Sequence, residues 1–366
     1  MTELSSKAPG AQEATHANAA VWSGPETGFT MELQPLPRLL PAEVLVQVEL
    51  ATICGSDLHT ISGDRPTPLP TVLGHEAVGT VKAVGGSAAT ADGRPVVPGQ
   101  RVTWTIGTSC GSCRRCLRGV PQKCQSVRKY GHEAITDHWR FNGGFGTYCH
   151  LVEGTGLVPV PTELPAEVAA PANCATATVV CAARRAALTA GDTVVVIGCG
   201  MLGLTAVAYA RDLGAEHVIA CDVDDDRRDL ALKFGATVAC SPSTLDTAVR
   251  DFGSDIVFEL SGNSRAVQSA LDIVALDGRV ALVGSVSPGP RVSFEPNTFV
   301  RNLSRVVGCH NYAVADLAEA VDFLMRTPKQ GLFAGLVPDA HPLCDIGDAV
   351  TEARRGAAPR IALRMD

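Results

Sequence analysis

The spacing of hydrophobic and polar residues changes about midway along the chain, and the change predicts two kinds of structure. Before residue 160, short runs such as 43–49 (EVLVQVE) and 77–84 (AVGTVKAV) alternate apolar with polar residues and are separated by glycine and proline, which is typical of antiparallel strands. From 188 to 308, apolar β-branched runs such as 193–197 (TVVVI) alternate with helical stretches. That alternation predicts βαβ units on a parallel sheet.

With 366 residues the chain is too long for one compact core, so two domains are expected. The pattern places a disordered polar tail at 1–18, a β-rich domain at 19–175 that resumes at 310–366, and a parallel-sheet domain at 176–309. The uncharged stretch 193–210 has about the minimum length of a membrane span. Three glycines near its middle divide it into a strand and a buried helix, so no membrane segment is expected.

Charge and cysteine content narrow the possible functions. The net charge of -7 and the absence of a basic run longer than two arginines argue against nucleic acid as a partner. The 13 cysteines are an odd number, and no apolar segment near the N-terminus could serve as a secretion signal. We therefore expect a cytoplasmic protein with reduced thiols, in which closely spaced cysteines more often hold metal than form disulfides.

Four cysteines form the strongest motif. Cys110, Cys113, Cys116 and Cys124 have the spacing C-x2-C-x2-C-x7-C. Four thiolates on a short loop suit a closed tetrahedral zinc site, because the anionic sulfurs offset the charge of the dication. An iron–sulfur cluster would also use four thiolates, but this spacing differs from that of ferredoxins.

A glycine motif follows the run 193–197. Gly198, Gly200 and Gly203 form a G-x-G-x-x-G turn between a predicted strand and a predicted helix, where a pyrophosphate can bind the exposed N–H groups of the helix start. Asp222 ends the next strand, 19 residues later, where a carboxylate would accept hydrogen bonds from the adenosine ribose. A carboxylate there repels a 2′-phosphate, which favours NAD over NADP. Arg227 lies close enough to contact the same ribose and keeps NADP open.

A third set is dispersed along the sequence. Cys54 lies in CGSDLH, His75 in GHE and Cys174 in NCAT. Two thiolates and one imidazole make a three-ligand zinc site with an open fourth position. Taken singly, each of these residues would be interpreted as buried filler.

The motifs together resemble the zinc-containing alcohol dehydrogenases of the medium-chain dehydrogenase/reductase superfamily. The match runs from about residue 19 to the end of the sequence and includes Gly143-Gly144-Phe145. The resemblance implies an α/β fold with a GroES-like β-rich catalytic domain and a Rossmann domain with a doubly wound parallel sheet. It also implies two zinc ions per chain, one catalytic and one structural, an alcohol or carbonyl substrate, and a homodimer or homotetramer.

The resemblance also assigns individual roles. Cys54, His75 and Cys174 would bind the catalytic zinc, with Glu76 beside it. Ser56 would take the proton of the substrate hydroxyl and pass it toward His59, and Asp57 would orient His75. Thr178 would be a further cofactor contact. Cys174 is the least typical of the ligands, because the family more often has a glycine beside this cysteine.

A second Gly-His-Glu triplet, with His132 and Glu133, competes for the role of His75. His75 is preferred because it follows Cys54 at the family's distance and leads into a strand. The segment 125–150 is long and polar, and the resemblance there is closest to a branch associated with phosphonate catabolism. That branch suggests an anionic substrate with Arg128, Lys129 or Arg140 as contacts, whereas a solvated loop and a primary, secondary or cyclic alcohol are equally compatible with the residues.

A non-catalytic redox sensor that binds zinc and a dinucleotide is the alternative from another functional class. It would use some of the cysteines that the two zinc sites leave without a role, although most of these are interpreted more simply as small buried hydrophobes. They are Cys149, Cys181, Cys199, Cys221, Cys240, Cys309 and Cys344.

Overall fold

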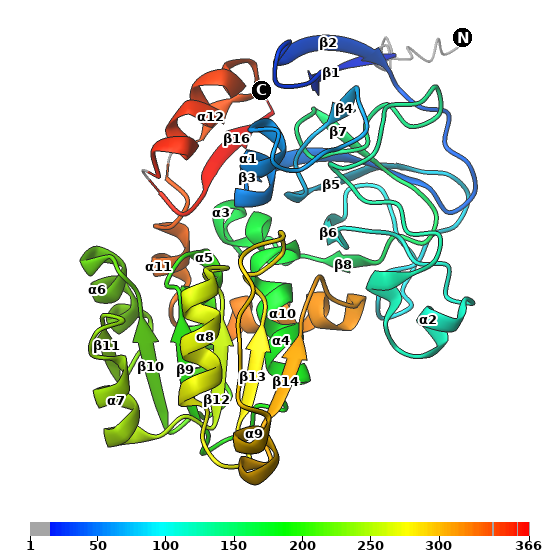
Figure 1. The fold of residues 1–366 in the computed structure, drawn as a ribbon. Coiled ribbons are helices and arrows are strands. Elements are labelled where there is room, and N and C mark those ends of the chain that lie inside the picture. The colour runs from blue at the N-terminus through cyan, green and yellow to red at the C-terminus, as the bar shows by residue number, and fades with distance from the viewer. Residues whose placement is uncertain (1–14, 339, 357, 366) are drawn as a thin grey trace, which may run out of the picture.

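The structure is a computed structural model that describes residues 15–338, 340–356 and 358–365. Figure 1 shows a β-rich domain above a domain built on a parallel sheet, as the sequence predicts. Chain segments on both sides of the parallel-sheet domain contribute to the β-rich domain, because β16 pairs with β3.

The β-rich domain contains two sheets. The small one has the order β2-β1-β4, and the large one has the order β15-β16-β3-β5-β6-β8 with β7 also paired to β3. All neighbours are antiparallel except β15 and β16. The strands are β1 (His16–Trp22), β2 (Phe29–Pro35), β3 (Val44–Ile53), β4 (Thr71–Val72), β5 (Glu76–Val84), β6 (Arg101–Trp104), β7 (Tyr148–Leu151), β8 (Leu157–Pro159), β15 (His341–Pro342) and β16 (Ile361–Arg364).

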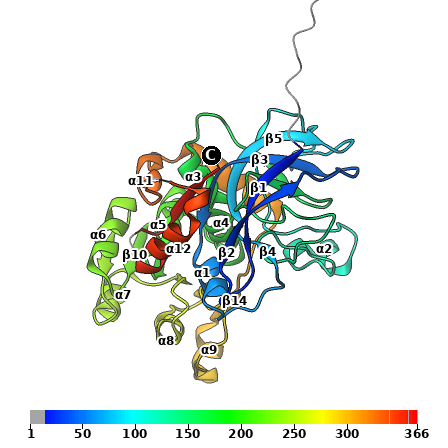
Figure 2. The ribbon, with the colours of Figure 1, turned by 90° about the horizontal axis from the view of Figure 1, so that it is seen from above.

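Short helices fill the turns of this domain. A separate lobe around α2 projects from its side (Figures 1 and 2). The α-helices are α1 (Gly55–Ile61), α2 (Arg114–Leu117), α3 (Ala166–Ala169) and α12 (Ile346–Arg355), and the 3-10 helices are η1 (Pro121–Lys123), η2 (Ala170–Asn173) and η3 (Leu343–Asp345). The short helix α11 (Gln330–Ala334) packs on the parallel-sheet domain, because Phe333 contacts Phe234 and Phe323.

The second domain has a parallel sheet in the order β11-β10-β9-β12-β13-β14, the strand order of a dinucleotide-binding fold. Its elements are β9 (Thr193–Ile197), β10 (His217–Cys221), β11 (Val238–Cys240), β12 (Ile256–Glu259), β13 (Arg279–Leu282), β14 (Arg305–Gly308), α4 (Ala175–Arg185), α5 (Met201–Asp212), α6 (Asp225–Phe234), α7 (Leu245–Phe252), α8 (Ser264–Ile273), α9 (Pro296–Asn302) and α10 (Val314–Arg326).

Helices cover both faces of this sheet. Buried residues of α4, α5, α6 and α10 pack with one face, and those of α7 and α8 pack with the other. The first of these clusters continues into the β-rich domain through Leu50, Val78 and Ala362. The two domains therefore share a hydrophobic core, which fixes the position of one against the other.

Two predicted boundaries differ from the structure. The predicted tail 1–18 overlaps β1, because His16, Ala17 and Asn18 pair with β2; residues 1–14 lie outside the described residues. The sequence also places 313–325 in the β-rich segment 310–366, whereas α10 packs on α4 and α5. Arg184 donates two hydrogen bonds to Asp316, at 2.7 and 3.0 Å, and Tyr209 stacks on Phe323 with ring centroids 5.0 Å apart.

The stretch 193–210 is two elements, β9 and α5, as predicted. Within the described residues, no single helix is long and apolar enough to cross a membrane, and only the bent pair 166–173 and 175–185 meets the length and composition required.

Candidate active site and metal centres

The dispersed residues of the third motif meet between the two domains. Cys54 follows β3, His75 and Glu76 lie at the start of β5, and Cys174 lies between η2 and α4. One ligand atom from each of these four residues lies within 4.8 Å of the others. Cys54, His75 and Glu76 are buried, so the cluster is a preformed set of donors shielded from water.

Asp57 links two members of the cluster. Cys54 is the N-cap of α1, and its N–H donates to Asp57 Oδ2 at 2.8 Å. The other oxygen of Asp57, Oδ1, lies 3.3 Å from His75 Nδ1. Because both side chains are fully buried, this carboxylate orients the imidazole so that Nε2 is left for a ligand.

The backbone before His75 needs a glycine. Gly74 has φ +87, and a Cβ on it would lie 2.4 Å from the ring of Phe145. The N–H of Phe145 donates to Leu73 O at 2.9 Å, and the N–H of Gly144 donates to Gly74 O at 2.7 Å. The segment Gly143-Gly144-Phe145, noted in the sequence as a motif, therefore holds the strand that carries His75.

Glu76 is paired with an arginine that sequence reasoning missed. Arg360 donates from Nε and Nη2 to the Glu76 carboxylate, at 2.6 and 2.8 Å, and its Nη2 lies 3.5 Å from Cys54 Sγ. Thr52 donates to Glu76 as well, at 2.5 Å. The sequence contains no signal for this contact, because 284 positions separate Arg360 from Glu76.

Cys174 is positioned by its neighbour. The Asn173 side chain donates to Trp104 O at 2.9 Å and accepts from Ala77 N–H at 3.3 Å. The Tyr312 hydroxyl donates to Asn173 O. These buried bonds attach the end of η2 to β5 and β6, which places Cys174 opposite Cys54.

The electrostatics of the cluster favour a thiolate at Cys54. Hydrogen bonding from Cys174 and the positive charge of Arg360 lower the pKa of Cys54 well below its usual value, against the effect of burial. Burial lowers the pKa of His75, but the neighbouring Asp57 and Cys54 outweigh it and raise that pKa overall. The anionic sulfur of Cys54 thus lies beside two positive groups, Arg360 and His75. A divalent cation bound to this sulfur would supply positive charge at the same place.

Ser56 and His59 both lie on α1. Ser56 Oγ lies 3.3 Å from His75 Nε2, so the hydroxyl is at the ligand face of the cluster. The His59 side chain is 54% exposed and its Nδ1 lies 3.6 Å from Asp64. Among the described residues no direct hydrogen bond joins Ser56 to His59.

The other four cysteines surround a single point in the α2 lobe. The Sγ atoms of Cys110, Cys113, Cys116 and Cys124 lie within 4.8 Å of one another, with Cys113 at 3.5 Å from Cys116 and 3.9 Å from Cys124. A zinc ion with about 2.3 Å bonds to four sulfurs implies separations of about 3.8 Å. Hydrogen bonds from Ser112 and from the Cys113 N–H lower the pKa of Cys110 to about 5, which suits a thiolate ligand.

Both donor sets therefore fit zinc. The lobe offers four sulfurs and no water position, as in a structural site. The buried cluster offers two sulfurs, an imidazole and a carboxylate that Arg360 holds, which suits a site with an exchangeable position.

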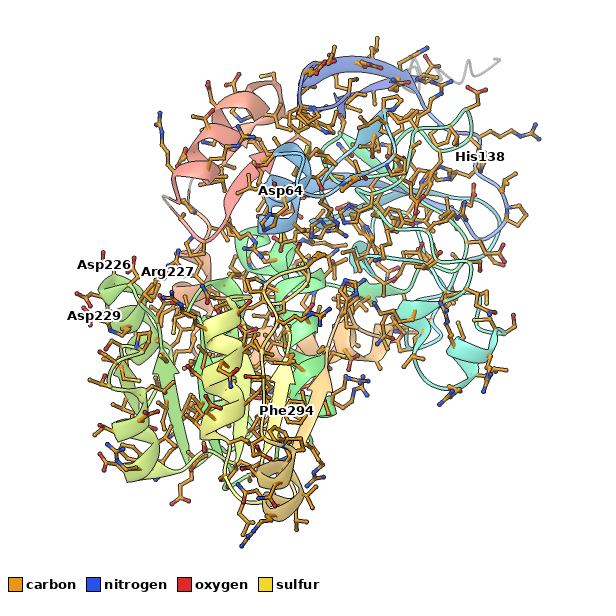
Figure 3. The ribbon with its side chains drawn as sticks, viewed as in Figure 1. Asp64, His138, Asp226, Arg227, Asp229 and Phe294 are labelled. Carbon is orange, nitrogen blue, oxygen red and sulfur yellow. The ribbon has the colours of Figure 1, made fainter. Side chains whose placement is uncertain are left out.

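A cavity of about 470 Å³ lies beside the buried cluster. Gly200 and Arg227 line it from the dinucleotide-binding domain, and Gly55 and Arg360 line it from the β-rich domain. Figure 3 shows Asp226 and Arg227 on the end of α6 that faces the β-rich domain. A Cβ on Gly203 would lie 1.9 Å from Gly198 O, and one on Gly200 would meet nothing within 4 Å. The glycines thus close the turn and leave room for a pyrophosphate.

Asp222 contacts the glycine turn. Its Oδ2 accepts from Cys199 N–H at 2.6 Å and its Oδ1 accepts from Asp224 N–H at 3.0 Å. Asp224 and Arg227 line the cavity, and Asp222 is not among the residues that line it. Thr178 lies one helical turn after Cys174, and its carbonyl accepts from Cys309 Sγ at 3.7 Å.

The second Gly-His-Glu triplet, which contains His132, lies next to the triplet that contains His75. The rings of His132 and His75 are 5.4 Å apart, but His132 is outside the donor cluster. Of the proposed anion contacts, Arg128 lies over the Trp139 ring at 5.2 Å and Arg140 pairs with Asp137 at 2.6 Å. Both arginines are thus engaged by other side chains of the segment 125–150. Lys129 is the remaining candidate among these three for contact with an anionic substrate.

The cysteines without a role lie mainly in the packed core. All except Cys344 are buried, and Cys221 and Cys240 are partners in neighbouring strands.

Comparison with known proteins settles the family. Residues 40–162 match the alcohol dehydrogenase GroES-like domain, and residues 202–326 match the zinc-binding dehydrogenase domain. An L-threonine 3-dehydrogenase of Anaeromyxobacter dehalogenans is 32% identical over 280 residues, which cover 72% of this chain and 75% of the relative. The chain belongs to the zinc-type medium-chain dehydrogenases.

Solved structures of this family have the same fold. An alcohol dehydrogenase from Thermotoga maritima has a TM-score of 0.90 at 26% identity and covers 96% of this chain and 100% of that one. Acetophenone reductase from Geotrichum candidum, solved in complex with NAD, has a TM-score of 0.77 at 28% identity, with 97% and 99% covered. The predicted GroES-like and Rossmann domains of this dehydrogenase are confirmed, and a redox sensor gains no support.

Proposed function

We propose that this zinc-type dehydrogenase transfers hydride reversibly between an alcohol and NAD, giving an aldehyde or ketone. The observation that carries the proposal is that one residue, Arg360, borders both the donor cluster and the cavity beside the glycine turn. Arg360 contacts Glu76 and Cys54 in the donor cluster and also lines the cavity beside the glycine turn. A substrate carbon held at the cluster would therefore lie against a cofactor held in the cavity.

The chain's own residues would hold and deprotonate the substrate. Cys54, His75 and Cys174 would bind the catalytic zinc, with Glu76 within reach, and Cys110, Cys113, Cys116 and Cys124 would bind the structural one. Zinc supplies Lewis acidity that lowers the pKa of a bound hydroxyl, and NAD accepts the hydride. The Ser56 hydroxyl, at the ligand face of His75, would take the proton from the substrate oxygen.

From Ser56 the proton would leave toward His59. The imidazole is half exposed and lies beside Asp64, so it can pass a proton to water. Because Ser56 and His59 make no direct hydrogen bond in the described part of the chain, a group of the bound cofactor would bridge them. The alignment of substrate and cofactor in a cleft that excludes water accounts for the rest of the rate.

The cofactor is proposed to be NAD. Asp222 directly follows β10 and has a buried carboxylate, and a second negative charge from a 2′-phosphate would be repelled there. Asp224, which lines the cavity, adds to the same effect. The positive charge of Arg227 would attract a 2′-phosphate, so the preference for NAD over NADP is expected to be moderate.

The substrate class is a primary, secondary or cyclic alcohol. Relatives named L-threonine 3-dehydrogenase favour a secondary hydroxyl within that class.

The experiment combines a substrate screen with metal analysis. NADH formation is measured over primary, secondary, cyclic and anionic alcohols, and zinc is measured on the same sample. We expect two zinc ions per chain in the wild type. Cys54→Ser should retain one zinc and bind NADH as the wild type does, but form no NADH with any alcohol. Cys344→Ser, which changes an exposed cysteine far from both clusters in sequence, is the control. A Cys54→Ser enzyme that turns over without the second zinc would disprove the mechanism.

A further inference from the structure

Five basic side chains gather where the substrate would enter. Lys123 Nζ contacts His310 Nδ1, and both line a cavity of about 520 Å³ at the carboxyl ends of β13 and β14. Cys309, in the same lining, contacts the Thr178 carbonyl on α4, one turn after Cys174. This contact links the cavity to α4, the helix that follows Cys174, and the glycine turn is not among the residues that line the cavity.

The remaining three cations come from two segments that are hydrogen bonded to each other. Lys129 begins the turn that carries His132, whose N–H donates to Lys129 O at 3.2 Å. The loop with Arg65 crosses this turn, because Thr67 Oγ1 donates to His132 O at 3.3 Å and Ile135 N–H donates to Pro70 O at 2.7 Å. Since the His132 ring lies 5.4 Å from that of His75, the turn borders the catalytic cluster.

An acidic neighbour of this group is Glu133, which accepts a hydrogen bond from the Lys129 N–H at 3.0 Å and whose charge raises the pKa of Lys129. Within the described ranges, none of Arg65, Lys123, Lys129, His132 and His310 makes an ion pair with a carboxylate. Their mutual repulsion helps to lower the pKa of Lys129 and that of His310. Burial, together with the charges of Lys123 and Arg65, lowers the pKa of Lys129. Partial desolvation and the charges of Lys123, Lys129 and Arg65 lower the pKa of His310 to about 4.

His132 adds an unused polar atom. Its Nδ1 is shielded from solvent and has no hydrogen-bond partner among the described residues. A shielded imidazole nitrogen without a partner costs free energy, and the partly buried Lys129 beside the charges of Lys123 and Arg65 costs more. Such a cost is typical of a binding site in its empty form.

The cofactor does not account for this charge. The pyrophosphate would bind at the glycine turn, where Arg227 and Arg360 line the other cavity. The positive charge of this group comes from Arg65, Lys123 and Lys129, since the pKa of His310 is lowered to about 4 and that of His132 is lowered by burial. None of these residues lines the cavity beside the glycine turn, so the charge is available to the substrate.

We propose that Lys129 and Arg65, with Lys123, His132 and His310 around them, bind an anionic group, a carboxylate or a phosphate, on the alcohol substrate. The proposal rests on the proposed dehydrogenase function. It makes these side chains determinants of specificity, because an anionic group fixed there would orient the hydroxyl carbon at the donor cluster.

The test uses the zinc-loaded enzyme with NADH and two matched pairs of compounds. 3-Hydroxybutyrate is compared with 2-butanol, and glycerol 3-phosphate with glycerol, so that carboxylate and phosphate are distinguished. Calorimetry measures affinity, and NADH formation measures kcat and KM. We expect at least one anionic member to bind at least about tenfold more tightly than its neutral partner.

Matched variants assign the effect. Lys129→Met and Arg65→Met should each weaken anion binding by about tenfold or more and raise KM for the anionic alcohol more than they change kcat. Lys129→Arg, which keeps the charge, should retain binding. Lys82→Met removes an exposed lysine of β5 and should have no effect.

The possible outcomes separate the two proposals. Equal affinity for the anionic and neutral members, or anion binding that Lys129→Met leaves unchanged, overturns the anion site even if neutral alcohols are oxidised. Anion binding that depends on Lys129 upholds the site; if no NADH forms with any alcohol in that case, the proposed dehydrogenase function is the part that fails.

Discussion

Arg360 shows how one residue supports a whole site. It is 6% exposed, and it is the cation that lies against the fully buried Glu76. A buried ion pair adds little net stability compared with apolar side chains, but the removal of one partner leaves the other charge without compensation.

Arg360→Met should therefore destabilise the protein by about 3–5 kcal/mol. The double variant Arg360→Met/Glu76→Gln should recover part of this loss, because no buried charge remains. Urea unfolding of the zinc-loaded protein measures both. If the single and double variants unfold at the same urea concentration, the cost does not come from the unpaired carboxylate.

We expect the Asp222 carboxylate to affect both the choice between NAD and NADP and the conformation of the glycine turn. Since its carboxylate accepts from the Cys199 N–H, Asp222→Gly should weaken NAD binding and shift the ratio of NAD to NADP affinity toward NADP. Fluorescence titration with NADH and NADPH measures the ratio. Asp229→Ala, which changes an exposed residue of α6 labelled in Figure 3, is the control. An unchanged ratio in Asp222→Gly would show that this carboxylate does not contact the ribose.

Residue chemistry decided which parts of the site could be predicted. The lobe cysteines were identifiable because four thiolates in this spacing have few other uses, whereas Cys54 and His75 were identified only through the resemblance to a known family. Arg360, Asn173 and Tyr312 act through contacts between distant segments, and arginine, asparagine and tyrosine are common on surfaces, so their types carry no signal.

At the scale of elements, the segment 125–150 is held to β3 by a histidine–carboxylate contact. One carboxylate oxygen of Glu43 lies 3.0 Å from His138 Nε2, and the other lies 3.0 Å from His150 Nε2. His138 lies at the outer edge of the β-rich domain in Figure 3. These contacts also set a pH dependence. Burial raises the pKa of Glu43, but hydrogen bonds from His138 and Leu40 outweigh it and lower the pKa below 4.5. Burial lowers the pKa of His150 below 6.5.

Acid should therefore weaken the fold in two steps. In each case the folded-state pKa lies below the unfolded one, so the unfolded chain takes up protons first as the pH falls. Stability is lost below pH 6.5 through His150 and further below 4.5 through Glu43. Urea midpoints across this range should decline in the wild type.

Glu43→Gln should lower stability at neutral pH by about 1–3 kcal/mol and flatten the lower part of the decline. Glu49→Gln, which removes a carboxylate that pairs with Arg101 and not with a histidine, should not flatten it. A wild-type curve that stays level between neutral pH and pH 5 would contradict the assignment.

The four central strands of the parallel sheet, β9, β10, β12 and β13, were predictable to within one or two residues, because they are mostly buried apolar runs. The edge strands β11 and β14 were not predicted, because they are short and only partly buried. The start of β1 was not, since His16, Ala17 and Asn18 are small or polar and become a strand only by pairing with β2. The place of α10 was not predictable either, because its apolar face fits any core and the Arg184–Asp316 pair that locates it is not visible in the sequence.

At the scale of the whole molecule, β14 is one of the two edge strands of the parallel sheet. Apolar side chains around it are exposed, and Figure 3 shows one of them, Phe294, near α9. We propose that a second copy of the chain covers this edge, because an uncovered apolar edge strand invites pairing. The exposed residues are Val286, Phe294, Val300, Leu303 and Val306.

Val306→Asp should therefore convert the proposed homo-oligomer into a smaller species, measured by light scattering after size-exclusion chromatography. Leu33→Asp changes a residue of β2 that is also exposed and should leave the mass unchanged. A monomeric wild type, or a Val306→Asp variant of unchanged mass, would locate the interface elsewhere or exclude it.

The pairing of β16 with β3 has a consequence for biosynthesis. The ribosome makes β3 early, but its partner at Ile361–Arg364 and the adjoining Arg360 emerge only after the entire parallel-sheet domain. That domain is continuous in the chain and can fold while it is being made. Until β16 arrives, β3 is unpaired at Leu50–Ile53 on the edge that β7 covers at Val44–Gln47, and the carboxylate of Glu76 lacks its arginine. The catalytic cluster is therefore among the last parts of the molecule to form, and the unpaired edge of β3 is the segment that a chaperone would have to protect during synthesis.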